Sequence, residues 1–262
     1  MKININNINF AFKKNTNPIF KNFSLNLSPD ESPVMILGSS GCGKTTLLRI
    51  IANMLNVNGG EIIFGGTNDD QQTQKNDLAP KISFIFQEPR LFPNLTVLEN
   101  VALPLENIIN TQKMTKQQSQ DRLKYFLDIL GLSEKASAYP SELSGGQAGR
   151  VSIARAWCYP SELLLMDEPF QSLDIPLRIA LLDAVRNLMS IEKRFVIAVT
   201  HDPREAIYMG RRIIVLGKTQ TGDAKIMLDE LQCADGNAEF ISEQSIPTEK
   251  RLIAALSAGS KK

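Results

Sequence analysis

A glycine-rich segment at residues 38–46 has the residue types and spacing that bind phosphate groups. It matches the pattern G-x-x-x-x-G-K-[ST], and it lies between a short apolar run and a stretch with helical apolar spacing. Glycines let backbone N–H groups turn towards a ligand, a helix N-terminus adds partial positive charge, and Lys44 adds a full charge. The segment therefore predicts a site for a nucleoside triphosphate, whereas an ordinary Gly-rich turn would not need these flanking elements. Its residues are Gly38, Ser39, Ser40, Gly41, Cys42, Gly43, Lys44, Thr45 and Thr46.

Two carboxylates, Asp167 and Glu168, follow the apolar run at residues 163–166. The run predicts a buried strand, and parallel α/β sheets bind ligands at the carboxyl ends of their strands. Asp167 is therefore expected to hold Mg²⁺ through water. Glu168, beside a polyphosphate site, is placed to orient or deprotonate an attacking water.

His201, the only histidine in the chain, follows another apolar run at residues 195–199. A lone histidine usually has a structural role, but this position at a strand's carboxyl end favours contact with a γ-phosphate. Gln87 follows a third run, at residues 81–86, immediately before prolines that interrupt regular structure.

The composition limits the classes of protein to consider. The chain has 262 residues, 43% of them hydrophobic, which is enough for one substantial core and a smaller lobe. Lys and Arg total 29 against 28 for Asp and Glu, so the net charge gives no electrostatic attraction for nucleic acid or anionic lipid. Three cysteines in no paired pattern favour a reducing compartment, with the cytoplasm as the default. Neither a signal peptide nor an apolar run of ~18 residues is found, so membrane association is expected only through a partner.

Apolar patterning predicts the order of the secondary structure. Strands are expected at residues 3–12, 20–27, 34–37, 61–64, 81–86, 163–166 and 195–199. Helices are expected at residues 45–55, 96–105, 115–132, 143–156 and 176–191, with a short one at 248–256. Residues 107–116 are expected to form a polar loop and residues 65–80 a surface loop, and the chain from Lys218 is polar and weakly patterned. Together these elements predict an α/β protein with an inserted helical lobe.

The segment Leu143-Ser144-Gly145-Gly146-Gln147 lies about one hundred residues after the phosphate-binding segment and about twenty before Asp167. In this order and spacing, the three motifs resemble those of the nucleotide-binding subunit of an ATP-binding-cassette (ABC) transporter. A P-loop kinase or GTPase would share the phosphate-binding segment but not this signature. The resemblance covers about residues 3–216. It implies an α/β fold: a P-loop NTPase core with a parallel sheet, an antiparallel β subdomain and an inserted α-helical subdomain.

The resemblance also implies domain boundaries. An ABC ATPase domain would span residues 1–217, followed by a short C-terminal extension at 218–262. Within the domain, residues 1–86 and 160–217 would form the core with the β subdomain, and residues 87–159 would form the helical subdomain with the signature.

ATP and Mg²⁺ are the cofactors that the resemblance implies, and ATP hydrolysis is the reaction. Lys44 would hold the β- and γ-phosphates, Glu168 would polarise the hydrolytic water, and His201 would hold the γ-phosphate. Gln87 would touch metal and water and report the nucleotide state to the helical subdomain. The implied metal-binding residues are Thr45, Gln87 and Asp167.

Other residues are implied to act across a dimer. Ser144, Gly146 and Gln147 would complete the nucleotide site of the opposite subunit, and Asp174 would cross the interface. Family members stack adenine on an aromatic ring about 25 residues before the phosphate loop. Phe12 fits that place, with Phe10 as the competing choice and a role in the strand core as the alternative for either ring.

Two further features of the sequence concern the stability of the signature helix and the reactivity of a cysteine. Ala148 and Gly149 stand where family members commonly carry polar residues, and a glycine inside a helix predicts a locally looser helix. Cys42, near a helix N-terminus, is either a thiol with a depressed pKa that reacts with thiol reagents or an inert one.

The kind of transporter follows from the same resemblance. A cassette without a membrane span is similar to the separate ATP-binding subunits of bacterial importers, most of all those of the nitrate, sulfonate and taurine type. The implied partners are integral membrane permease subunits, a second ATPase subunit, with a homodimer favoured, and indirectly an external solute-binding protein, but no nucleic acid. The protein would be cytoplasmic and peripheral on the inner face of the cell membrane. An exporter ATPase subunit and a soluble cassette ATPase such as an iron–sulfur assembly factor are the alternatives.

Overall fold

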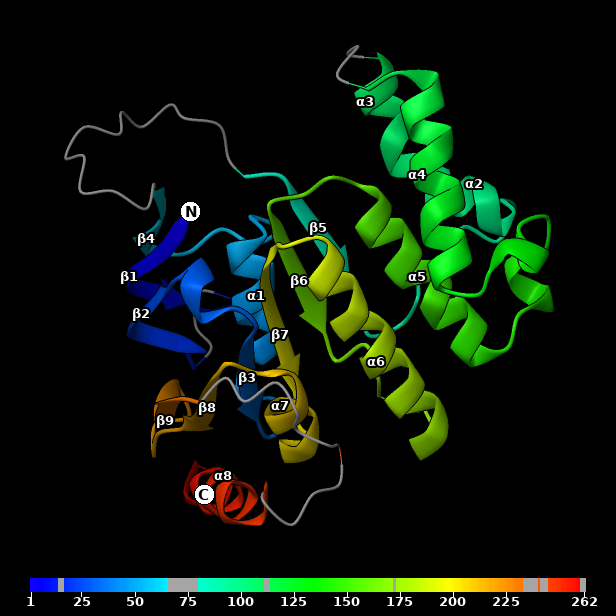
Figure 1. The fold of residues 1–262 in the computed structure, drawn as a ribbon. Helices are drawn as coiled ribbons and strands as arrows, with labels where there is room; N and C mark the ends of the chain where they lie inside the picture. Colours follow the sequence, from blue (N-terminus) through cyan, green and yellow to red (C-terminus); the bar gives the residue numbers. More distant parts are fainter. Residues whose placement is uncertain are drawn as a thin grey trace. The chain divides into compact units, whose positions relative to one another are not determined.

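The computed structural model describes residues 1–13, 17–65, 80–110, 114–171, 173–232, 240 and 245–259. The chain divides into two compact units (Figure 1). The first unit comprises Met1–Pro80 and Phe195–Lys262, and the second comprises Lys81–Arg194.

Parallel strands form the centre of the first unit. Strand β3 (Val34–Gly38) pairs in parallel with β7 (Phe195–Thr200) and with β8 (Arg212–Lys218), and β9 (Ala224–Leu231) adds to β8 in the antiparallel sense. Every residue of β3 and β7 is buried, which explains their continuous apolar sequences. The register pairs Leu37 with Thr200 and Gly38 with Leu216, so the carboxyl ends of the three parallel strands coincide.

An antiparallel sheet with the order β2–β1–β4 forms the rest of the β structure in this unit. Its strands are β1 (Lys2–Phe10), β2 (Phe20–Leu27) and β4 (Gly59–Gly65). Burial alternates along β1 and β2, as expected for strands with one face in the core. The helices of the unit are α1 (Lys44–Ile51), α7 (Pro203–Met209) and α8 (Ile246–Gly259), and a 3₁₀ turn covers Pro29–Glu31.

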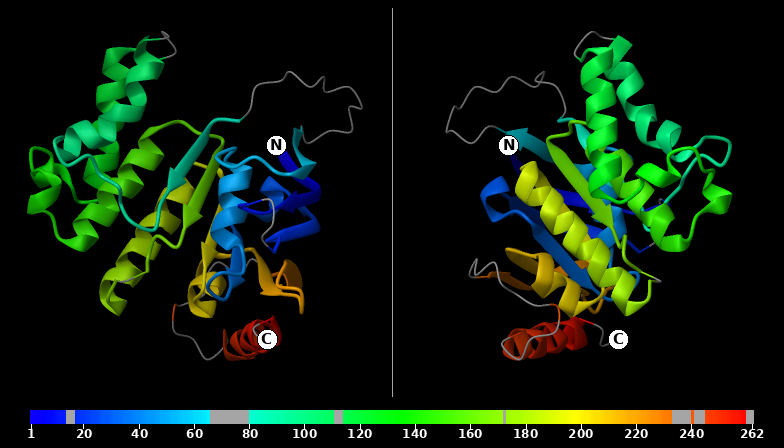
Figure 2. Two further views of the ribbon diagram at one scale, coloured as in Figure 1. Left: turned by 180° about the vertical axis from the view of Figure 1, so that it is seen from behind. Right: turned by 45° about the vertical axis from the view of Figure 1, so that its right-hand side comes forward.

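The second unit combines two parallel strands with a group of helices. Strand β5 (Ile82–Ile85) pairs with β6 (Leu163–Asp167). The helices are α2 (Val97–Ala102), α3 (Glu106–Asn110), α4 (Lys116–Ile129), α5 (Gly145–Cys158) and α6 (Ile175–Ile191), with 3₁₀ turns at Leu103–Leu105, Ser133–Lys135 and Pro140–Glu142. Helices α2, α4 and α5 contact one another and gather into one cluster (Figure 2).

A cluster of charged side chains fixes the C-terminal end of α5. Arg122 Nε of α4 donates to the Cys158 carbonyl at 2.6 Å, and the almost fully buried Arg194 donates to the Ala156 carbonyl at 3.0 Å. Glu192, just after α6, pairs with Arg122 at 2.7 Å and with Arg194 at 2.8 Å. Cations at the C-terminus of a helix satisfy its last carbonyl groups and interact favourably with its dipole. The cluster therefore ties α5 to α4 and to the end of α6.

The α/β class expected from the sequence is confirmed, and three local expectations need correction. Helix α3 occupies part of the region 107–116, where a polar loop was expected. Helix α7 and strands β8 and β9 were not among the expected elements, and the side chains of β9 are only partly buried and show no clear alternation. Helix α8 extends beyond the expected 248–256 at both ends. The expected surface loop at 65–80 lies largely outside the described residues.

Gly149, inside α5, offers a test of the stability of this helix. A Cβ atom at Gly149 would lie 3.5 Å from Leu181 Cδ1, which is ordinary van der Waals contact. Since Ala is favoured over Gly in a helix interior by about 1 kcal/mol, Gly149→Ala should stabilise the protein by about that amount. Thermal unfolding should then show a melting temperature about 2–4 °C higher.

The matched variant is Gly146→Ala in the first turn of the same helix. There a Cβ atom would lie 2.5 Å from Leu177 Cδ2, so the leucine would have to move and the gain should be smaller or reversed. An equal rise in melting temperature for the two variants would contradict this account.

Candidate functional site

The phosphate-binding segment links β3 to α1 in the first unit (Figure 1). Gly41 and Gly43 have φ angles of 75° and 108°, a region that side-chain-bearing residues rarely adopt, so both turns need glycine. Gly38 is required for a different reason. A Cβ atom there would lie 2.6 Å from Cys42 Sγ and 2.7 Å from the Leu216 carbonyl oxygen of β8. The loop is therefore packed directly against the neighbouring strand.

Lys44 reaches back over this loop. Its ammonium donates to the Gly38 carbonyl at 2.8 Å and to the Ser39 carbonyl at 3.3 Å, and the residue is only 4% exposed. Helix α1 begins after Gly43, and no side chain in the described part of the molecule caps this end. A full positive charge and an uncapped helix N-terminus thus face the same loop, which suits a phosphate group.

The structure decides between the two alternatives that the sequence left open for the Cys42 thiol. Its side chain is buried, and burial raises the pKa of the thiol, although the nearby positive charge of Lys44 partly opposes the effect. The alternative of a depressed pKa is therefore wrong, and the thiol is of the inert kind. Burial likewise raises the pKa of Cys158 to about 12.

His201 directly follows β7, and hydrogen bonds on both sides brace its position. The buried Thr200 donates through Oγ1 to Glu205 Oε2 at 2.5 Å, and the same hydroxyl accepts the backbone N–H of Asp202 at 3.1 Å. Asp202 in turn caps α7 by accepting the Arg204 N–H at 2.8 Å. Because the Thr200 hydroxyl must donate in one direction and accept in the other, it holds the two residues that flank His201 in one arrangement.

The two candidate aromatic residues differ sharply in exposure. Phe12 lies beyond the end of β1 and is 63% exposed, whereas Phe10 is 5% exposed and belongs to the core. Their rings contact edge to face, with centroids 5.1 Å apart and an interplanar angle of 81°. Only Phe12 presents ring area that a ligand could cover.

The acidic pair lies at the end of β6 in the second unit. Asp167 is the last residue of the strand and is buried, and Glu168 follows with a φ angle of 45°. Non-glycine residues rarely adopt this left-handed conformation, and it is concentrated at functional sites. The turn continues with a hydrogen bond from the Gln171 N–H to the Glu168 carbonyl at 3.2 Å. The backbone therefore turns sharply between the two carboxylates.

Gln87 is held in a loop that follows β5. Its side-chain amide donates to the side-chain carbonyl of Gln171, in the segment after the acidic pair. Further along the loop, the two terminal nitrogens of Arg155 donate to the Pro89 carbonyl at 2.9 Å and to the Arg90 carbonyl at 3.0 Å. Arg155 belongs to α5, so the helix that begins at the signature also supports the Gln87 loop.

The signature residues start α5 through reciprocal hydrogen bonds. Ser144 Oγ accepts the Gln147 N–H at 3.3 Å, and Gln147 Oε1 accepts the Ser144 N–H at 2.9 Å. This is a capping box, and the S-x-x-Q pattern in the sequence would have revealed it. Asp174, expected at a dimer interface, is the N-cap of α6 and accepts the Leu177 N–H at 2.9 Å. Gly146 packs against Leu177, so the first turns of α5 and α6 lie together.

The expected site residues are therefore distributed over both units. The phosphate-binding segment, His201 and Phe12 belong to the first unit, and Gln87, Asp167, Glu168, the signature and Asp174 belong to the second. Within the second unit, Gln87 meets the segment after Glu168, and the signature meets the turn after Asp174. No group of three or more His, Cys, Asp or Glu side chains suited to a metal ion is found in the described residues.

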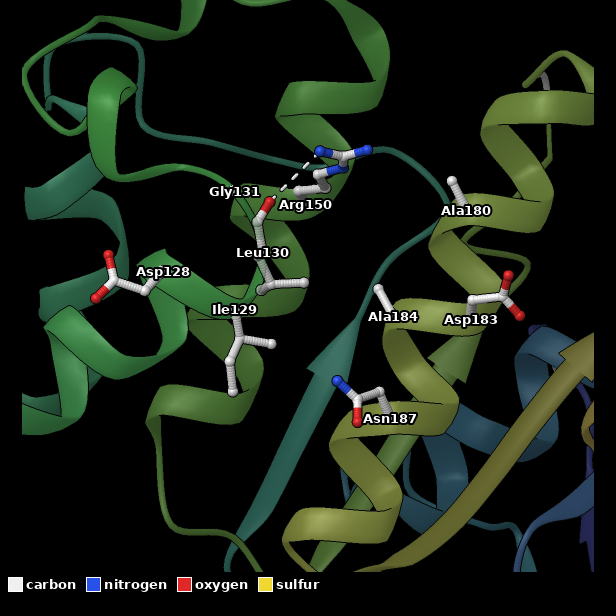
Figure 3. Close-up of a pocket in the computed structure, with 9 residues that line it drawn as sticks. All are labelled: Asp128, Ile129, Leu130, Gly131, Arg150, Ala180, Asp183, Ala184 and Asn187. Atoms are coloured by element: carbon white, nitrogen blue, oxygen red, sulfur yellow. Dashed lines mark hydrogen bonds between the residues drawn. The ribbon is translucent and has the colours of Figure 1, made fainter.

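A hollow of about 430 Å³ lies elsewhere in the second unit. The C-terminal end of α4, Arg150 of α5 and residues of α6 between Ala180 and Asn187 line it, with Asp128 and Asp183 among the lining residues (Figure 3). Arg150 points across it to the Leu130 carbonyl at 3.5 Å (Figure 3). None of the expected site residues lines this hollow.

The raised pKa values of the cysteines lead to a test of reactivity. The thiolate is the reactive form, so a buried thiol with a raised pKa should react slowly at about pH 8. We expect iodoacetamide to modify Cys42 and Cys158 at least about tenfold more slowly in the native protein than in urea, with rates that rise towards higher pH. Mass spectrometry of the two peptides measures this. Equal rates for Cys42 in native and unfolded protein would contradict its assignment as inert.

Comparisons with known proteins support the resemblance in the sequence. The ABC transporter family matches residues 20–171. The sulfate/thiosulfate import ATP-binding protein CysA of Neisseria meningitidis is 40% identical over 228 residues, which cover 86% of this chain and 62% of that relative. This chain thus spans less than two thirds of its length. The aliphatic sulfonates import ATP-binding protein SsuB of Bacillus cereus is 38% identical over 218 residues, which cover 82% of this chain and 81% of the relative.

A solved structure is similar as well. A dimeric ATP-binding cassette in a post-hydrolysis state, bound to ADP and Pi, has a TM-score of 0.69 and 31% identity, and the match covers 87% of this chain and 98% of that one. Among the described residues, no helix has both the length and the apolarity needed to cross a membrane. With the family match extending over more than half of its residues and a relative such as SsuB matched over most of its length, this chain belongs to the ABC transporter family.

Proposed function

We propose that this chain binds and hydrolyses ATP and that it energises the import of a solute through permease subunits in the membrane. The observation that carries the proposal is the signature at residues 143–147, which begins helix α5 in a chain that also holds the phosphate-binding segment and the acidic pair. Other phosphate-binding folds share the segment but lack the signature.

The residues present fit ATP and Mg²⁺. Lys44 and the N-terminus of α1 would bind the phosphates, and Thr45, Gln87 and Asp167 would hold Mg²⁺. Asp167 is a buried carboxylate at a strand end, which is the oxygen ligand that Mg²⁺ prefers. When bound, the metal would neutralise charge that develops on the transferred phosphoryl group.

The chain's own residues would then act on water and phosphate. Glu168, which follows β6 with a left-handed φ angle of 45°, would orient the attacking water and accept its proton. His201, braced by Thr200 on the first unit, would donate to the γ-phosphate. Phe12 offers an exposed ring for the adenine. Because phosphoryl transfer needs little covalent chemistry from the protein, positioning and charge would supply most of the catalysis.

A second subunit would complete each nucleotide site. Ser144, Gly146 and Gln147 form a helix N-terminus, which carries partial positive charge suited to a γ-phosphate on another copy. Asp174 is the N-cap of helix α6 as Ser144 is of α5, so two of the four residues implied to act across the dimer are helix caps in one unit. The dimeric relative with bound ADP and Pi supports a homodimer here.

The importer assignment rests on the relatives. CysA and SsuB are import ATP-binding proteins for sulfate or thiosulfate and for aliphatic sulfonates. By analogy, this subunit would lie on the inner face of the cell membrane, bound to permease subunits, and would serve a transporter that takes its solute from an external binding protein. An exporter subunit or an iron–sulfur assembly ATPase is the alternative.

Replacing the water-directing carboxylate tests the catalytic part of the proposal. Glu168→Gln keeps the size of the side chain but removes the base, so ATP hydrolysis should fall by at least about 100-fold while ATP binding remains. An ATP-bound dimer should also accumulate, which size-exclusion chromatography with ATP and Mg²⁺ would detect.

Glu162→Gln is the matched control, because Glu162 is exposed at the opposite end of β6. It should hydrolyse ATP at the wild-type rate. The role of Glu168 is refuted if both variants retain full activity.

Purification from membranes tests the transport part. If the chain serves a transporter, solubilised membranes should yield it in complex with integral membrane proteins, identified by mass spectrometry. Recovery only in soluble complexes would favour the assembly ATPase instead.

A further inference from the structure

We propose that Lys218 is a second cation that binds the phosphate groups of the nucleotide, in addition to Lys44. The inference rests on the nucleotide binding proposed above. It assigns a binding role to a residue at the end of a strand that carries no motif.

The position of Lys218 follows from the pairing of strands. Strand β8 runs parallel to β3 with Leu216 opposite Gly38, so both strands end at the edge where the phosphate-binding segment begins. Lys218 is the last residue of β8. Its ammonium nitrogen lies 3.7 Å from the point that a Cβ atom on Gly41 would occupy. The charge therefore sits beside the apex of the loop, while Lys44 contacts the carbonyls at residues 38 and 39.

The electrostatics of the loop agree with this position of Lys218. Among the influences on the Cys42 thiol, burial is the largest and raises its pKa, whereas the charges of Lys44 and then Lys218 lower it. Lys218 is thus close enough to act on a group inside the loop. An anion bound in the loop would experience the same field with a favourable sign.

Lys218 also lacks a competing carboxylate partner among the described residues, since none of the ion pairs found there includes it. The nearest acid along the chain, Asp223, is engaged by Thr219 at 2.6 Å and by Thr221. These bonds close the turn between β8 and β9, and the Ala224 N–H donates to the Ile19 carbonyl at 2.7 Å. The backbone that follows Lys218 is therefore held, while the charge of Lys218 remains available to an anion.

The expected contribution is moderate. Lys218 is exposed, so water and salt weaken its attraction for phosphate, and its long side chain loses rotamer freedom on binding. The effect should grow with the charge of the ligand, because ATP presents more negative charge near the loop than AMP does.

Calorimetric titration with ATP, ADP and AMP in the presence of Mg²⁺ tests the proposal on the full chain. Lys218→Gln should weaken ATP binding by about 3–10-fold, and ADP binding by less, while leaving the affinity for AMP within about twofold. Lys218→Arg should restore most of the ATP affinity, because it keeps the charge. The difference between Lys218→Gln and wild type should shrink in 0.5 M salt.

Lys225→Gln is the matched control. Lys225 is an exposed lysine on β9 opposite Gly217. Its replacement changes the net charge and the composition of the β8–β9 hairpin as much as Lys218→Gln does, but it leaves the charge beside Gly41 in place. It should bind ATP as the wild type does. Thermal unfolding of all variants would confirm that each is folded.

The outcomes separate the two proposals. The role of Lys218 is overturned if Lys218→Gln binds ATP as tightly as the wild type, or if Lys225→Gln loses as much affinity as Lys218→Gln. In either case the proposed function stays intact as long as the wild type binds ATP and Lys44→Ala does not. A wild-type protein that fails to bind ATP overturns both.

Discussion

The contact between Gly38 and the backbone of β8 is the constraint on which the nucleotide-binding part of the structure depends. With only 2.7 Å between the Leu216 carbonyl oxygen and the place of a Cβ atom, no side chain larger than hydrogen fits at the start of the loop. This contact brings β8 against the loop, seals Cys42 from solvent and places the end of β8 beside Gly41. Gly38 thus allows β8 to border the phosphate loop, while the turns of the loop depend on Gly41 and Gly43.

In the second unit, the corresponding constraint is the packing between the ends of two helices. The signature and Asp174 are both N-caps, and their helices meet where Gly146 packs on Leu177. The far end of α5 is held just as firmly, through Arg122, Arg194 and the carboxylate of Glu192. A helix fixed at both ends presents its N-terminal N–H groups in one direction. Such preorganisation lets a helix terminus stabilise charge without a cost of rearrangement at the moment of reaction.

The residues of the candidate site were easier to propose from the sequence than the hydrogen bonds and packing that hold them in place. Glycine spacing and strand-end carboxylates are local signals, so the phosphate-binding segment and Asp167 could be named without coordinates. The brace that Thr200 and Glu205 form around His201 depends on side-chain directions that no spacing reveals. Strand β9 escaped prediction because its stability comes from pairing with β8 rather than from its own pattern. The reactivity of Cys42 was open for a similar reason: its pKa reflects the balance between burial and charge, and only packing sets that balance.

Arg155 has a consequence for how such a protein can evolve. Its planar guanidinium donates to two successive carbonyl oxygens in the Gln87 loop while its own backbone belongs to the signature helix. Lysine would offer a single ammonium nitrogen in place of these two planar terminal nitrogens, so it would not reproduce this geometry. A sequence change that reshapes the Gln87 loop would therefore also disturb the helix that begins at the signature. Changes in this loop are for this reason expected to affect its surface side chains, with its backbone path retained.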